Sequence, residues 1–292
     1  MPLPNDLPLL CPLCLKPLAA ADTRASGPAR MACGSGHSFD AARQGYFNML
    51  VGKGTSFEAD TAAMADARST FLGTGHYAPL ARGVAAAVVP CLSSEHAAVL
   101  DAGTGTGHYL RAVLDSAAEQ GRTVNAVGID ISKFALRRAA RLNPEAVNLV
   151  WDVWKRIPLA DGSVDAVTVI FAPRNPAEFA RVLRPHGRLV VVTPRAGHLS
   201  TLAALTGMLG IEEGKDSRLA SAMAEHFDAE SATDVDIPLS LTRREAADLA
   251  FMGPAGHHQG RDAIADRLDS SPEPLAADAK FRVLVYRPKS RL

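Results

Sequence analysis

From residue 97 onward, short apolar runs alternate with amphipathic helical stretches, and this alternation constrains the fold more than any other feature. Short apolar runs between helices predict strands that are buried on both faces, as in a parallel sheet covered by helices. The runs lie at 97–103, 124–130, 147–151, 164–172, 188–194, 235–241 and 281–287. We therefore predict an α/β fold with a Rossmann-like, seven-stranded sheet.

The chain divides into three parts. Its 292 residues exceed one typical domain, and a hydrophobic content of 47% is enough for a sizeable core. We predict a small metal-binding module at 1–45, a helical linker at 46–95 and the main domain at 96–292. The linker includes a helix over 60–72, where apolar residues recur at helical spacing. In the main domain, we expect the polar segment 196–230 to be helical and to cover the active site.

Charge and hydropathy narrow the cellular setting. The formal net charge is zero, so no global field favours nucleic acid, although a local basic patch remains compatible with that total. The amino-terminal residues lack a basic region followed by an apolar stretch, and no eighteen apolar residues run together. We expect a cytoplasmic protein that does not enter a membrane.

The sequence VLDAGTGTGHYL indicates a cofactor loop between a strand and a helix. Gly103, Gly105 and Gly107 allow positive φ and a close approach of backbone N–H groups to a ligand. Asp101 ends the strand before them, and Asp130 ends the next strand, where an acidic side chain can bind ribose hydroxyls. The alternative is that these glycines form only a tight turn between the strand and the helix and bind no ligand.

The spacing of these glycines argues against a dinucleotide. The dinucleotide fingerprint places its third glycine three positions after the second, whereas Gly107 comes two after Gly105. Asp101 would repel a pyrophosphate but suits the amino group of a methionine moiety. Asp152, after the third strand, could reach an adenine amino group, and a solvated aspartate is the alternative. These residues favour S-adenosylmethionine as the cofactor.

Three of the four cysteines lie within the first 33 residues of the chain. Cys11 and Cys14 form a CxxC pair, and Cys33 and His37 form a second pair. Two such pairs complete the tetrahedral coordination that zinc prefers, and four protein ligands leave no position open for a catalytic water. We predict a structural zinc site; unrelated thiols are the alternative. Basic residues in and beside this module could contact nucleic acid, with a solvated surface as the alternative: Lys16, Arg24, Arg30, Arg43 and Lys53.

The order of these motifs resembles the RlmA-type methyltransferases, which methylate N1 of a guanine in large-subunit ribosomal RNA. The resemblance spans nearly the whole chain, and its most specific elements are CPLC with CGSGH, GYFNML and GHYAPL. It implies a class I methyltransferase sheet behind an N-terminal zinc module, with Cys11, Cys14, Cys33 and His37 as the zinc ligands.

The resemblance also implies further site residues and partners. Tyr77, Gly105, Thr106 and His198 would bind the cofactor; from sequence alone, Tyr77 reads as a core aromatic and His198 as a polar residue at a helix start. A hairpin loop of 23S ribosomal RNA would be the substrate, and the protein would be a homodimer. FAPRN and MGPAGHH are closer to the actinobacterial branch linked to tylosin and mycinamicin resistance, although MGPAGHHQG departs from that branch in detail.

Methyl transfer to guanine N1 requires alignment, loss of the N1 proton and stabilisation of the guanine oxygen. FAPRN follows the fourth strand, so Arg174 and Asn175 are the candidate catalytic residues; Arg174 could equally bind phosphate. Two other functions stay open. One is a small-molecule methyltransferase, and the other is a non-catalytic, zinc-dependent RNA-binding protein.

Overall fold

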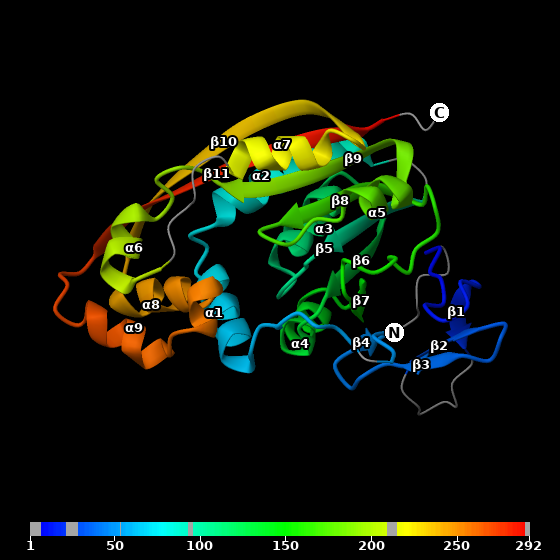
Figure 1. The fold of residues 1–292 in the computed structure, drawn as a ribbon, viewed down its shortest axis with the longest axis horizontal. Coiled ribbons are helices and arrows are strands. Elements are labelled where there is room, and N and C mark those ends of the chain that lie inside the picture. Colours follow the sequence, from blue (N-terminus) through cyan, green and yellow to red (C-terminus); the bar gives the residue numbers. More distant parts are fainter. Residues whose placement is uncertain (1–6, 22–28, 53, 93–95, 209–214, 290–292) are drawn as a thin grey trace.

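The computed structural model describes residues 7–21, 29–52, 54–92, 96–208 and 215–289. Arg24 and Lys53, two of the basic residues in and beside the predicted zinc module, lie outside them. Figure 1 shows a large sheet with helices on both faces, and a small sheet of three strands at one end.

The large sheet has the order β10-β11-β9-β8-β5-β6-β7-β4. From β9 to β4 neighbouring strands are parallel, whereas β11 is antiparallel to both β9 and β10. The strands are β4 (Tyr46–Asn48), β5 (Ala97–Ala102), β6 (Val124–Asp130), β7 (Val147–Val150), β8 (Val164–Ile170), β9 (Leu183–Pro194), β10 (Phe227–Leu241) and β11 (Leu275–Pro288). All seven predicted strands are present, and the predicted α/β fold class is confirmed.

The central strands are buried on both faces, as their continuous apolar runs predict. In β5, Val99 packs into a first core on one face of the sheet, whereas Ala98 and Leu100 pack into a second core on the other face. In β9, Val190 and Val191 divide in the same way. Because successive side chains of a strand point to opposite faces, each strand contributes to two separate cores.

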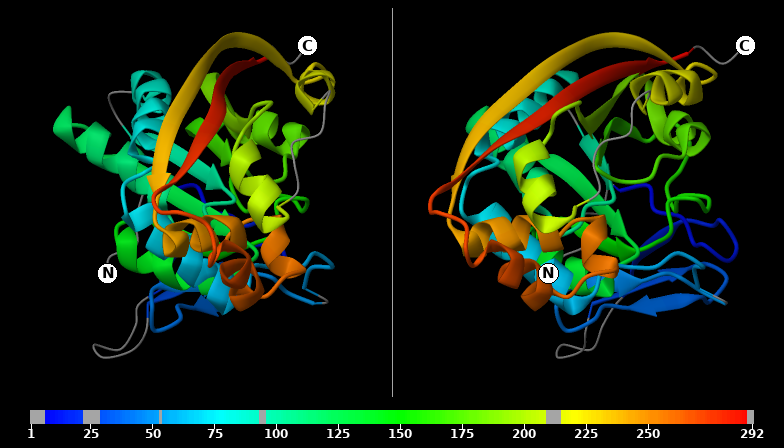
Figure 2. Two further views of the ribbon diagram at one scale, coloured as in Figure 1. Left: turned by 90° about the vertical axis from the view of Figure 1, so that its left-hand side faces the viewer. Right: turned by 60° about the vertical axis from the view of Figure 1, so that its left-hand side comes forward.

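Helices cover both faces of the sheet, and a further group of helices lies beyond one end of it. Helices α2 (Ala78–Val88) and α3 (His108–Glu119) pack on the first core, and α4 (Lys133–Leu142) packs against β6 and β7. Helices α5 (Pro176–Val182) and α7 (Lys215–Met223) pack on the second core. Helices α1 (Ala62–Gly73), α6 (Ser200–Thr206), α8 (Arg243–Phe251) and α9 (Arg261–Leu268) gather beyond one end of the sheet (Figure 2).

Local signals explain where several helices begin. The helix predicted over 60–72 is α1, and the Thr61 side chain caps it by accepting a hydrogen bond from the Met64 N–H. Thr242 and Glu245 form a reciprocal capping box at α8. Two short 3-10 helices, η1 (Val89–Cys91) and η2 (Pro254–His257), follow α2 and α8.

The two C-terminal strands differ most from the prediction. We predicted strands at 235–241 and 281–287, but β10 starts at Phe227 and β11 at Leu275, and the two form a long hairpin that arches along one side of the molecule (Figures 1 and 2). Residues 227–230, predicted as helical, are therefore strand. The rest of the segment 196–230 contains α6 and α7, which pack in different cores, and its residues 209–214 lie outside the described ranges.

The N-terminal residues form a small sheet of β1 (Leu18–Ala21), β2 (Arg30–Cys33) and β3 (Ser38–Asp40). This sheet is not a separate core, because Leu7, Met31 and Phe39 belong to the same apolar cluster as β5 and β9. The predicted helical linker at 46–95 begins with β4, which pairs with β7 as an eighth strand. Its three residues are too few to show a strand periodicity in the sequence.

Within the described ranges, no helix is both long and apolar enough to cross a membrane.

A buried carboxylate at the start of β8 tests this packing. Asp165 is 0% exposed and accepts hydrogen bonds from the Ala98 N–H at 2.8 Å and from Nη1 of Arg184 at 2.7 Å. Replacing Asp165 by Ala should lower the free energy of unfolding by about 1–3 kcal/mol, because buried donors lose their acceptor. Urea denaturation measures this loss. Asp115→Ala on the exposed face of α3 is the control and should leave the stability nearly unchanged. Equal losses of stability in both variants would show that the buried hydrogen bonds of Asp165 do not stabilise the fold.

Candidate functional site

The predicted metal ligands come together at one end of the molecule. The thiols of Cys11, Cys14 and Cys33 and a ring nitrogen of His37 all lie within 4.8 Å of one another. Cys11 and Cys14 flank a turn before β1, and Cys33 ends β2. The hairpin that follows β2 returns His37 to the two thiols nearest it.

The separations within this cluster fit tetrahedral zinc. Nδ1 of His37 lies 3.5 Å from the sulfurs of both Cys11 and Cys33, and the sulfurs of Cys14 and Cys33 are 3.6 Å apart. Zinc–sulfur bonds of about 2.3 Å and zinc–nitrogen bonds of about 2.0 Å give tetrahedral edges of about 3.5 Å for S···N and about 3.8 Å for S···S. The Lys16 N–H is the main cause that lowers the pKa of Cys14 to about 6, which favours the thiolate. Four protein donors make this a structural zinc site.

The cofactor loop has the conformation that its glycines predict. Gly103, Gly105 and Gly107 all have positive φ, at 81°, 54° and 82°. A β-carbon on Gly103 would lie 2.3 Å from Cβ of Ala172, and one on Gly107 would lie 2.5 Å from Nδ2 of Asn143. Larger residues would therefore clash. The loop lies between the ends of β5 and β6 and is held close to the segment after β8.

Asp101 lies beside this loop with its carboxylate buried. Oγ1 of Thr168, on the neighbouring strand β8, donates a hydrogen bond to it at 2.6 Å. Burial raises the pKa of Asp101 to about 6, and the hydrogen bond from Thr168 acts in the opposite direction. A buried carboxylate of this kind favours a cationic ligand group, because a cation stabilises its charged form.

Asp130 ends β6 on the other side of the loop. Its carboxylate accepts hydrogen bonds from the Gly105 N–H at 2.9 Å and from the Ser132 N–H at 2.7 Å. Burial raises the pKa of Asp130, and the hydrogen bond from Ser132 is the main opposing cause. Thr106 is buried in the same loop. Asp130 thus fixes the loop and retains acceptor capacity for hydroxyl groups.

Asp152 follows β7 and is tied to the segment that leaves the zinc module. It accepts hydrogen bonds from Oγ1 of Thr55 at 2.8 Å and from the Trp154 N–H at 3.0 Å. A cavity of about 390 Å³ opens nearby, at the ends of β4, β6 and β7. Its lining includes Asn48, Asp60, Ile131, Phe134 and Val150.

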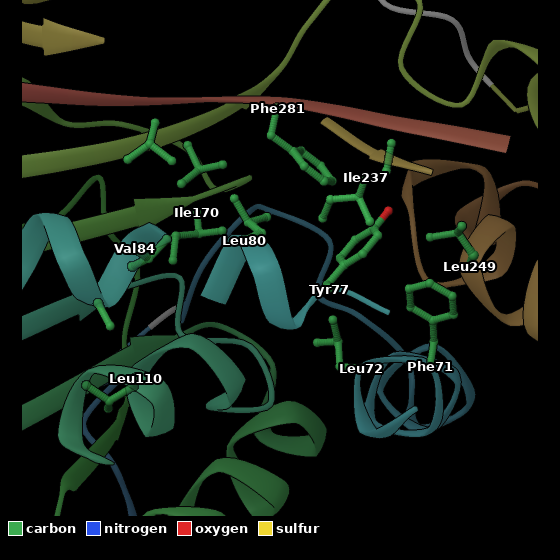
Figure 3. Close-up of a cluster of buried hydrophobic side chains, with 14 of the residues drawn as sticks. Phe71, Leu72, Tyr77, Leu80, Val84, Leu110, Ile170, Ile237, Leu249 and Phe281 are labelled. Carbon is green, nitrogen blue, oxygen red and sulfur yellow. The ribbon is translucent and has the colours of Figure 1, made fainter. Parts of the chain in front are cut away.

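Tyr77 and His198 belong to one chain of aromatic rings, in which both contact Phe281. Tyr77 lies edge-on between Phe71 of α1 and Phe281 of β11, with centroids 5.1 Å from each (Figure 3). The ring of His198 lies 4.7 Å from Phe281. Tyr77 is buried, as the core-aromatic alternative predicts, and Phe281 is the ring that both Tyr77 and His198 contact.

The protonation of His198 follows from its surroundings. Burial lowers the pKa of His198 to about 4, so the ring is neutral at pH 7. Nδ1 accepts a hydrogen bond from the Lys280 N–H at 3.0 Å, which leaves the hydrogen on Nε2. In this tautomer His198 offers a ligand a donor at Nε2.

Arg174 and Asn175 occupy the segment between β8 and α5. The Asn175 amide is engaged in the scaffold, since its Oδ1 caps α5 and its Nδ2 donates to the Val153 carbonyl at 3.0 Å. Arg174 is half-buried, and burial lowers its pKa. Its Nε has no hydrogen-bond partner among the described residues. Of the two, Arg174 is the residue free to act on a ligand.

Three further residues at this site were missed by sequence reasoning. Arg68 of α1 lies over the cofactor loop, where its Nη1 would be 3.4 Å from a β-carbon on Gly105. Tyr109 is the second residue of α3, just after the loop, and its buried hydroxyl has no partner among the described residues. Phe171 follows β8 with its ring exposed. Position next to GTGTGH could have indicated Tyr109, whereas nothing in the sequence brings α1 to the loop.

Together these residues fit S-adenosylmethionine. The loop supplies backbone N–H groups and room for a ligand, Asp101 supplies a buried anion, and Asp130 lies at the end of the next strand. The unpartnered hydroxyl of Tyr109 is a polar atom that a bound ligand could satisfy.

Zinc should hold the N-terminal residues in place. Replacing Cys14 by Ser should reduce the zinc content from about one atom per chain to near zero, because three protein ligands bind zinc far less tightly than four. Hydrogen exchange should then accelerate in β1, β2 and β3 while β8 and β9 stay protected. Cys91→Ser is the control, since Cys91 is remote from the cluster and its thiol donates to the Ala87 carbonyl. Unchanged protection in zinc-free protein would show that the metal is not structural.

Comparison with known proteins agrees with both parts of this site. Residues 99–187 match the family described as "Methyltransferase domain", and residues 9–52 match the family described as "RlmA, N-terminal", a zinc ribbon. The expected methyltransferase domain and structural zinc are thereby confirmed. A solved complex of the Haloferax volcanii Trm112 methyltransferase activator with a methyltransferase has the same fold, with a TM-score of 0.51 and 18% identity, covering 80% of this chain and 100% of that chain.

Curated relatives match over most of the chain. The 23S rRNA (guanine(748)-N(1))-methyltransferase of Streptomyces fradiae is 40% identical over 90% of this chain and 91% of its own length. A Micromonospora griseorubida protein, with 23S rRNA (guanine-N(1)-)-methyltransferase in its name, is 42% identical over 98% of this chain and 99% of its own length. The zinc ribbon, the cofactor loop and this full-length similarity all agree: the chain belongs to the RlmA-type family of 23S rRNA (guanine-N1)-methyltransferases.

Proposed function

We propose that this protein transfers the methyl group of S-adenosylmethionine to N1 of a guanine in a hairpin loop of 23S ribosomal RNA. The observation that carries this proposal is the 40–42% identity to named guanine-N1 methyltransferases over at least 90% of the chain. The site geometry supports it, because the cofactor loop and the segment after β8 meet at one edge of the sheet.

The charged groups around the loop suggest how the cofactor is held. Asp101 accepts hydrogen bonds from the ammonium group of the methionine moiety, and Arg68 pairs with its carboxylate. Asp130 binds the ribose hydroxyls. Asp152 and the nearby cavity receive the adenine, and Tyr77 and His198 bind on the methionine side. The remaining loop residues contact the ligand through backbone or hydroxyl groups: Gly103, Gly105, Thr106 and Gly107.

When bound, the cofactor supplies an electrophilic methyl group on a sulfonium, and the protein aligns guanine N1 with it. N1 carries a proton at neutral pH, and negative charge develops on the guanine oxygen as that proton passes to solvent water. Arg174 donates to this oxygen, in agreement with its unpartnered Nε. The engaged amide of Asn175 favours a positioning role, in which it caps α5 and orders the segment that holds Arg174.

The proposal also covers the form of the RNA substrate and the oligomeric state of the protein. A guanine in a loop can leave its stack more readily than a paired one, which favours a hairpin loop over a duplex. A homodimer in the cytoplasm and a contribution to macrolide resistance rest on the family resemblance and are part of this proposal.

Incubation with tritiated S-adenosylmethionine and unmodified 23S ribosomal RNA tests the function. We expect labelled 1-methylguanosine and a stop in primer extension at one loop guanine, because N1 methylation blocks base pairing by the template. Asp130→Ala should abolish the labelling. Cofactor binding without labelling of naked RNA or ribosomal subunits would instead indicate a small-molecule methyltransferase. A protein that neither binds the cofactor nor labels RNA would indicate a non-catalytic RNA-binding protein.

Cofactor affinity should depend on the charge of Asp101. Its pKa, raised to about 6 in the folded protein, means that the carboxylate is charged at pH 7.5 and protonated below pH 6. Because burial penalises the charged form of Asp101, this group favours the folded protein most below about pH 4, and this contribution to stability is lost as the pH rises through its folded pKa of about 6. The ammonium group needs the charged form, so affinity should fall as the pH is lowered from 7.5 to 5.

Calorimetric titration at several pH values measures this dependence. Asp101→Asn should bind more weakly at pH 7.5 and should lose the step near pH 6. A step of the same size in Asp101→Asn would assign the pH dependence to another group.

A further inference from the structure

Phe171, the residue directly after β8, has an unfavourable backbone and an exposed ring. Its φ is +56°, in the left-handed region that bulky side chains rarely adopt. The side chain is 45% exposed, so burial of the ring offsets only part of this strain. Glycine or asparagine would fit the same turn with less strain. Strain of this kind is concentrated at functional sites, where the surrounding structure maintains it.

The position of Phe171 relates it to the cofactor loop. Its neighbour Ala172 is the residue that a β-carbon on Gly103 would meet at 2.3 Å. The Phe171 ring lies 6.3 Å from Tyr109, which follows the loop, and 5.4 Å from Phe281 of β11. One side of the ring therefore rests on the aromatic residues of the site, and the rest is open to a ligand.

We infer that the exposed ring of Phe171 stacks on the guanine that receives the methyl group. This inference rests on the proposed function. A guanine that leaves its stack in an RNA loop loses contact with its neighbours, and an aromatic ring at the edge of the cofactor loop replaces that contact. Stacking holds the base by its face and leaves its N1 edge free to be directed at the methyl group.

A purely structural role fits these observations less well. An aromatic side chain that serves the core is buried, as Phe281 and Tyr77 are here, and usually has a relaxed backbone. Binding of the cofactor by Phe171 is the other possibility. It makes a different prediction, because the affinity for S-adenosylhomocysteine would then depend on the ring.

The test compares Phe171→Gly, Phe171→Tyr and the wild type by steady-state methylation of a 23S hairpin RNA. Phe171→Gly should lower kcat/KM for RNA roughly 5- to 150-fold, the range expected for one base–aromatic stack. Its Tm should not fall, because glycine relieves the strained φ. Phe171→Tyr keeps the ring and should retain most of the wild-type kcat/KM. The affinity of both variants for S-adenosylhomocysteine should stay within about twofold of the wild type.

Leu142→Ala is the matched control, since Leu142 is an apolar residue that is 43% exposed at the end of α4. Its kcat/KM should equal that of the wild type. Phe171→Gly with wild-type kcat/KM, or Phe171→Tyr as impaired as Phe171→Gly, would overturn the stacking role. A large loss of S-adenosylhomocysteine affinity would assign the ring to the cofactor. A wild-type protein that methylates no RNA would refute the proposed function and this inference with it.

Discussion

The close contact between Gly103 and Ala172 is the constraint on which the rest of the site depends. β5 and β8 are neighbours in the parallel sheet, so the segments that follow them leave the same edge side by side. Only a glycine at 103 allows the two segments to approach as they do. One segment carries the backbone groups for a cofactor, and the other carries Phe171 and Arg174. Their contact therefore sets the distance between a bound methyl donor and the base that would receive the methyl group.

The zinc module is connected to this site by a continuous path of the chain. Cys11 and Cys33 belong to the same apolar cluster as the central strands, so the metal orders residues that pack directly on the sheet. From β4 the chain passes along the ends of β7 and β6, where Thr55 donates to Asp152 and the Asp60 carbonyl accepts from Ser132. Asp60 also pairs with Arg68, over the cofactor loop. Loss of zinc is therefore expected to affect the cofactor side of the protein as well as the module.

Much of the fold was predictable because buried parallel strands have continuous apolar runs. All seven predicted strands form. The glycine loop has the positive φ angles that its glycines predict, and the four zinc ligands cluster as their spacing predicts. The prediction was wrong where side chains face solvent. The start of β10, with Glu230 and Ser231 exposed, has no apolar pattern, so 227–230 read as helix. Arg68, which was missed at the site, reaches it through a tertiary contact: helix α1 places its side chain over Gly105, and no local pattern in the sequence records that contact.

On the proposed function, the methyl donor and the target base meet where the cofactor loop contacts the segment after β8. A crystal structure with S-adenosylhomocysteine and a 23S hairpin RNA tests this most directly. We expect the homocysteine sulfur beside the loop at Gly103, with one guanine unstacked against the Phe171 ring and its N1 edge facing the sulfur. A guanine bound on another face of the sheet, or a cofactor bound away from Asp101 and Asp130, would contradict it.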